Sequence, residues 1–78
     1  MALAKIERER AARGEGCLGK AADDEPVFVL RGQDVLAPDL VDLWAARAQV
    51  NGCGPEKVAG ARELAAKMRA WAPRKYPD

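Results

Sequence analysis

The chain has 78 residues, a formal net charge of +1 and an aromatic content of 5%. A domain this small buries only about 60% of the surface that its unfolded chain exposes, so we expect one domain with a thin core. The sequence contains no Ser, Thr or His, which excludes Ser-His-Asp and Cys-His nucleophiles, a histidine general base and histidine-containing metal sites; we expect no enzyme and no cofactor.

The first expected helix covers residues 2 to 13, where acidic and basic side chains alternate at helical spacing. Its apolar positions are few, so we expect residues 1 to 22 to be semi-independent or frayed. Residues 14 to 21 match the Gly-x-x-x-x-Gly-Lys pattern of phosphate-binding loops. A charged helix precedes them, however, and Ala21 stands where such a loop needs a hydroxyl for magnesium. We interpret them as a flexible turn.

The only run of β-branched and aromatic residues lies at positions 27 to 31. An acidic triplet precedes this run, and we interpret it as a solvated turn rather than a cation site. Such a run is typical of a short buried strand. A lone strand has no partner in its own chain, so we expect an interchain pairing edge or an extended connector packed under the helices, and not an exposed strand. The expected protein interface consists of Val27, Phe28, Val29, Arg31, Gln33 and Asp34. Asp34 can also cap a short turn after the strand.

Two longer helices follow, at positions 38 to 50 and 55 to about 71, and each begins with a proline. Between them, Asn51 or Gly52 can adopt the left-handed conformation that closes a helix. We expect the first helix to turn Leu40, Leu43 and Trp44 inward, with Val41, Ala45 and Ala48 widening the same face. The expected inward set of the second helix is Val58, Ala61, Leu64, Ala65, Met68 and Trp71 or Ala72.

The expected fold is therefore mainly α: an N-terminal helix, one short strand or extended segment, and an antiparallel helical hairpin, followed by a mobile tail at positions 73 to 78. The hairpin also permits a helix-turn-helix interpretation with nucleic acid as the partner. We favour the plain hairpin, because the basic side chains are spread around the second helix and the net charge is only +1. The possible nucleic-acid contacts are Lys57, Lys67, Arg69, Arg74 and Lys75.

The two cysteines, Cys17 and Cys53, are expected to be free thiols in the cytoplasm, because the sequence shows no export signal. A disulfide between them is the alternative. A reactive Cys17 beside Lys20 is also conceivable, but a thiol in a glycine-flanked loop is usually inert. No apolar run approaches the ~20 residues that span a bilayer, so we expect no membrane partner.

One stretch resembles a known group of proteins. Residues 24 to 34, Asp-Glu-Pro-Val-Phe-Val-Leu-Arg-Gly-Gln-Asp, with Leu36-Ala37-Pro38 and Trp44-Ala45 after them, are similar to a pattern in short uncharacterised proteins of bacteriophages and prophage regions. The resemblance covers residues 16 to 72 and implies a bacterial or phage cytoplasmic setting, with no catalytic residue to carry over. We expect a small non-enzymatic interaction or accessory protein that self-associates as a homodimer or binds another protein, with weak nucleic-acid binding as the alternative.

Overall fold

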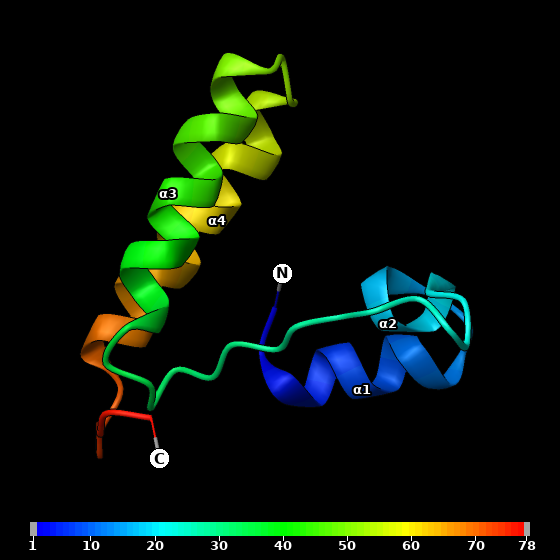
Figure 1. The fold of residues 1–78 in the computed structure, drawn as a ribbon, viewed down its shortest axis with the longest axis horizontal. Helices are drawn as coiled ribbons and strands as arrows, with labels where there is room; N and C mark the ends of the chain where they lie inside the picture. The colour runs from blue at the N-terminus through cyan, green and yellow to red at the C-terminus, as the bar shows by residue number, and fades with distance from the viewer. Residues whose placement is uncertain (1, 78) are drawn as a thin grey trace.

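The computed structural model describes residues 2 to 77 and consists of two helical hairpins joined by an extended stretch of chain (Figure 1). The helices are α1 (Ala4–Ala12), α2 (Gly16–Lys20), α3 (Ala37–Val50) and α4 (Pro55–Ala70). Helix α1 packs on α2 and α3 packs on α4, whereas the helices of one hairpin make no contact with those of the other. The mainly helical fold and the C-terminal hairpin confirm the expectation from the sequence.

The turn between α3 and α4 has the predicted conformation. Gly52 has a φ of 81°, in the left-handed region where a residue with a Cβ is strained. The side-chain amide of Asn51 donates a hydrogen bond of 2.8 Å to the carbonyl oxygen of Arg47, and thereby satisfies one of the carbonyls that a helix end leaves without a partner. Helix α4 then begins at Pro55, as predicted.

The core lies between α3 and α4 and consists almost entirely of small side chains. Ala45, Val58 and Ala61 form its centre, and Val41, Ala48 and Cys53 pack against them. Further along the same seam, the buried residues are Ala37, Pro38, Ala65 and Met68. Small residues at a helix contact allow the two backbones to come close, but they remove little apolar surface from water.

The predicted inward face of α3 is confirmed for Val41, Ala45 and Ala48 and wrong for its large side chains. Leu40, Leu43 and Trp44 remain 48%, 49% and 44% exposed, and Trp71 after α4 is 59% exposed. Apolar residues recur at helical spacing on two neighbouring faces of α3. One face carries large side chains and the other carries small ones. The face with small side chains contacts α4.

Ion pairs between α3 and α4 accompany the orientation of α3 in which its small side chains face α4. The Nη2 of Arg69 on α4 lies 2.8 Å from a carboxylate oxygen of Asp39 and 2.7 Å from one of Asp42. On the same side of the hairpin, Arg62 donates a hydrogen bond of 3.1 Å to the side-chain oxygen of Gln49. These contacts hold the side of α3 that carries Asp39, Asp42 and Gln49 against α4, and the leucines of α3 remain half exposed.

The N-terminal hairpin differs from the expected flexible turn, because residues 16 to 20 form helix α2. A Cβ added at Gly19 would lie 2.7 Å from the carbonyl carbon of Gly14 and 3.2 Å from the Cα of Ala11. Glycine therefore permits a backbone-to-backbone approach of α2 to the end of α1 that any other residue would prevent. No residue of α1 is buried.

Candidate protein-binding site

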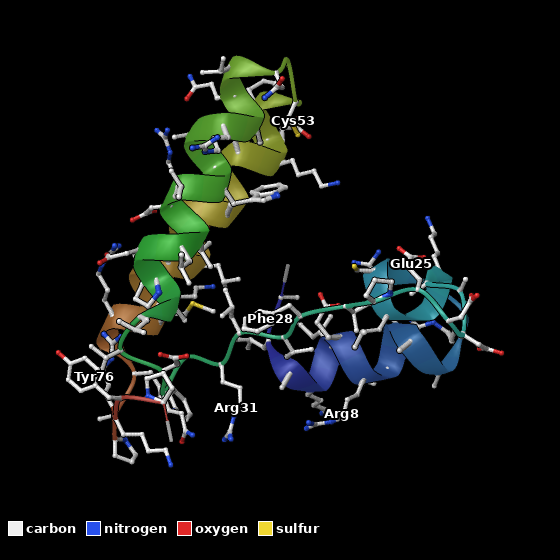
Figure 2. The ribbon with its side chains drawn as sticks, in the orientation of Figure 1. Arg8, Glu25, Phe28, Arg31, Cys53 and Tyr76 are labelled. Carbon is white, nitrogen blue, oxygen red and sulfur yellow. The ribbon has the colours of Figure 1, made fainter. Side chains whose placement is uncertain are left out.

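The run at residues 27 to 31 is an extended connector without strand pairing, and it is exposed. Phe28 is 85% exposed and Val29 66% exposed, and Figure 2 shows Phe28 on the chain between the two hairpins. Within residues 2 to 77, no hydrogen bond reaches residues 26 to 30. The expectation that this run is buried under the helices is therefore wrong for its apolar centre.

The connector becomes anchored at its C-terminal end. Gly32 lies against the base of the hairpin, where a Cβ would be 3.7 Å from side-chain atoms of Met68 and Trp71. Two residues later, a carboxylate oxygen of Asp34 accepts a 2.8 Å hydrogen bond from the backbone N–H of Leu36, which is the local capping role predicted for Asp34. The exposed run thus extends from a fixed base.

The C-terminal tail pairs with this base. The N–H of Lys75 donates a 2.8 Å hydrogen bond to the carbonyl oxygen of Gln33, and the N–H of Val35 donates one of 3.0 Å to the carbonyl oxygen of Lys75. Together they form an isolated parallel bridge between Asp34 and Lys75. The tail is attached at these residues, in contrast to the mobile tail expected from the sequence.

The Arg74 side chain also holds the tail against the residues that precede α3. Its guanidinium donates hydrogen bonds of 3.2 Å to the carbonyl oxygens of Arg69 and Asp34, and one of 3.4 Å to that of Val35. Its Nε is buried without a hydrogen-bond partner among the described residues. Arg74, expected as a nucleic-acid contact, therefore joins the end of α4, the start of α3 and the tail.

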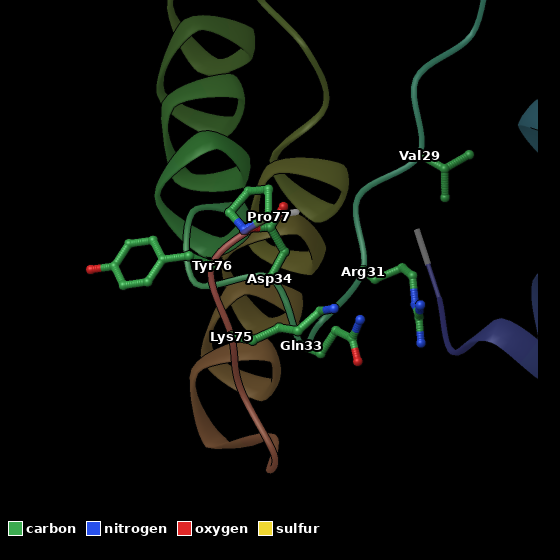
Figure 3. A pocket seen from close by; sticks show the side chains of 7 residues that line it. All are labelled: Val29, Arg31, Gln33, Asp34, Lys75, Tyr76 and Pro77. Atoms are coloured by element: carbon green, nitrogen blue, oxygen red, sulfur yellow. The ribbon is translucent and has the colours of Figure 1, made fainter.

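A shallow groove of about 230 Å³ lies where the connector meets the tail. We call it the tail groove; it is lined by Val29, Arg31, Gln33, Asp34, Lys75, Tyr76 and Pro77. In Figure 3, Lys75 and Gln33 lie beside each other, whereas the Tyr76 ring points away from Arg31. The groove combines an apolar wall from Val29 with the charges of Arg31, Asp34 and Lys75.

The tail groove brings together four of the six residues expected at a protein interface; Val27 and Phe28 precede it on the exposed part of the connector. Sequence reasoning missed Tyr76 and Pro77. A signal was present, because prolines at positions 73 and 77 favour extended backbone, which can pair with another extended segment.

The five possible nucleic-acid contacts do not form one surface. Arg69 is bonded to Asp39 and Asp42, which raise the pKa of its guanidinium above the ordinary value, and Arg74 binds backbone carbonyls. Lys75 lines the tail groove, whereas Lys67 lines a second pocket with Ala2, Leu3, Gly60, Glu63 and Leu64. Lys57 is exposed in the first turn of α4.

The other sequence motifs show no further site. Among residues 2 to 77, no group of three acidic or thiol side chains could hold a metal ion. In the acidic triplet, the carboxylate of Glu25 accepts a 3.1 Å hydrogen bond from the N–H of Ala22, as in a local turn. Cys17 and Cys53 are both free thiols, Cys17 exposed and Cys53 partly buried.

No helix of the described chain combines the length and apolar character needed to cross a bilayer. Comparisons with protein-family models, with curated proteins and with solved structures find no match to this chain.

Proposed function

We propose that this chain is a small, non-enzymatic accessory protein that acts by binding other polypeptides through residues 27 to 34. The observation that supports it is an extended, apolar stretch whose backbone groups at residues 26 to 30 have no hydrogen-bond partner within the described chain. Unpaired N–H and C=O groups on an extended segment are a template for pairing with a strand of another protein.

The side chains fit the same role. The exposed Phe28 and Val29 offer apolar contact, and the charge of Arg31 at the tail groove would fix the register of a bound chain. Backbone pairing supplies affinity in this mode of recognition, and alternate side chains supply specificity. The resemblance of residues 24 to 45 to short phage and prophage proteins adds a bacterial or phage setting to the proposal.

Nucleic-acid binding is less well supported, because Arg69 and Arg74 are occupied by contacts within the chain. The proposal of a non-enzymatic protein rests on the sequence, which has no Ser, Thr or His and therefore lacks the aliphatic hydroxyl and imidazole groups that most nucleophile and base arrangements use.

The proposal can be tested without a known partner. A displayed peptide library is selected on the wild-type protein after depletion on the Phe28→Asp variant, and we expect enrichment of extended apolar peptides. Since Phe28 is the only phenylalanine, 4-fluorophenylalanine places a single fluorine in the segment. Each selected peptide should shift this fluorine resonance.

The matched control is Val50→Asp, because Val50 is an equally exposed apolar residue, 87% against 85% for Phe28, at the far end of α3. This variant should retain peptide binding. If no peptide is enriched, or if the selected peptides bind Phe28→Asp as well as they bind the wild type, the proposed role of the segment is wrong.

A further inference from the structure

Helix α3 carries an apolar stripe that stays about half exposed in the described chain. It consists of Leu36, Leu40, Leu43 and Trp44, which are 48%, 48%, 49% and 44% exposed. Leu36 caps α3 and the others follow at spacings of four, three and one residue, so all four lie along one side of the helix. We call this set the α3 stripe.

The two other sides of α3 already have partners. Ala45 is buried in the seam with α4, and the side that carries Asp39 and Asp42 is bonded to Arg69. The α3 stripe occupies the remaining side, and its edge at Leu43 adjoins Asp39, one helical turn before it. A helix that is apolar on its solvent side as well as on its buried side is typical of an interface with another chain.

The chain as a whole exposes more surface than a compact monomer of its mass. The chain exposes 6127 Å² for a mass of 8.4 kDa, whereas a compact monomer of this mass exposes about 4,600 Å². The excess of about 1,500 Å² is spread over the two separate hairpins and the exposed connector, and the α3 stripe supplies part of it; obligate homodimers remove roughly 1,000 to 2,500 Å² from each partner. The radius of gyration, 13.2 Å against about 11.5 Å for a compact chain of this length, agrees with this excess.

We propose that a second copy of this chain covers the α3 stripe, with the two α3 helices antiparallel about a two-fold axis near Leu43. Leu36, Leu40, Leu43 and Arg47 recur at the alternating spacing of four and three residues that forms a seam between two helices. Such a dimer uses the same patch on both copies, so the assembly is closed and does not extend into a filament.

Charge selects the antiparallel orientation. In a parallel pair, Arg47 would face the same arginine of the other copy within an apolar seam, and like charges would repel. In an antiparallel pair centred on Leu43, position 47 faces position 39 of the other copy, where Asp39 is 85% exposed. A guanidinium and a carboxylate at the rim of the seam attract each other and fix its register.

This inference goes beyond the proposed function, because it involves α3 and not residues 27 to 34. Sedimentation equilibrium should give about twice the monomer mass of 8.4 kDa for the wild type. Leu43→Asp places two carboxylates beside the axis and should raise the dissociation constant at least about 100-fold. Ala66→Asp adds the same charge at an exposed position of α4, away from the α3 stripe, and should leave the dimer intact. Circular dichroism checks that both variants are helical.

Cross-linking tests the register independently of stability. In a variant with Cys17 and Cys53 replaced by alanine, a cysteine at position 43 lies beside its counterpart and should form an intermolecular disulfide under mild oxidation, whereas one at position 36 should not. A wild-type protein that sediments as a monomer, or Leu43→Asp that dimerises like wild type, overturns the proposal. A cross-link at position 36 as efficient as that at 43 overturns the antiparallel register. Phe28→Asp should leave the dimer unchanged, which separates this result from the peptide-binding test.

Discussion

Replacing Arg74 by alanine tests whether the C-terminal tail is an integral part of the fold. Its guanidinium donates three hydrogen bonds of 3.2 to 3.4 Å to backbone carbonyls of Arg69, Asp34 and Val35. These lengths are at the weak end for N–H···O bonds, so each contributes about 0.5 kcal/mol net, and the three about 1.5 kcal/mol together. We expect Arg74→Ala to lower the free energy of unfolding by this amount and Tm by about 6 to 12 °C.

Urea unfolding followed by tryptophan fluorescence measures this loss. The matched control is Arg62→Ala, which removes one hydrogen bond of 3.1 Å from an exposed guanidinium to the side chain of Gln49 and should cost at most about 0.5 kcal/mol. Both variants lose an arginine that links distant parts of the chain, so the comparison isolates the additional contacts of Arg74.

Amide hydrogen exchange gives a local readout of the same change. The N–H groups of Val35 and Lys75 make the bonds that hold the tail to the base of α3, so their exchange should accelerate in Arg74→Ala and remain slow in Arg62→Ala. Equal losses of stability in the two variants, together with unchanged exchange at Val35 and Lys75, would refute the anchoring role of Arg74.

Two further substitutions test the helical hairpin by urea unfolding. Ala61 is fully buried in the seam, so Ala61→Leu should lower the free energy of unfolding by about 1 to 3 kcal/mol, whereas Ala66→Leu at an exposed position should change it by less than about 0.5 kcal/mol; an unaffected Ala61→Leu would contradict the close helix contact. Gly52 has a φ of 81°, so Gly52→Ala should cost about 1 kcal/mol. Gly60 lies within α4 with nothing within 4 Å of an added Cβ, so Gly60→Ala should be neutral or stabilising by about 0.5 to 1 kcal/mol; similar values for both would contradict the left-handed turn.

The helices of the C-terminal hairpin are predictable because local residues set their ends. The prolines near the start of α3 and α4 fix φ at a position where the missing N–H is not needed. Gly52 stops α3 where a left-handed residue is required. Helix α2 was missed because it depends on a contact: Gly19 allows it to approach the end of α1, and a five-residue helix is not stable alone.

The candidate site was predictable only in part. The apolar, β-branched character of residues 27 to 29 identified the segment, and the acceptor group of Asp34 identified its local turn. The partner of that turn, the tail around Lys75, lies about 40 residues further along the chain, and no local pattern connects the two. Arg74 was assigned to nucleic acid because its charge is visible in the sequence, while the carbonyls that accept its hydrogen bonds are not.

The sequence by itself determined the helical class, the ends of α3 and α4, and the exposed charges, because propensity, proline and glycine act over a few residues. Only the tertiary structure decided which face of α3 is buried. Leu40 and Leu43 repeat at helical spacing just as Val41, Ala45 and Ala48 do, so periodicity supports either rotation. Close approach to Ala61 and the ion pairs of Arg69 with Asp39 and Asp42 select the small side chains. The leucines of α3 therefore remain exposed on its outer side.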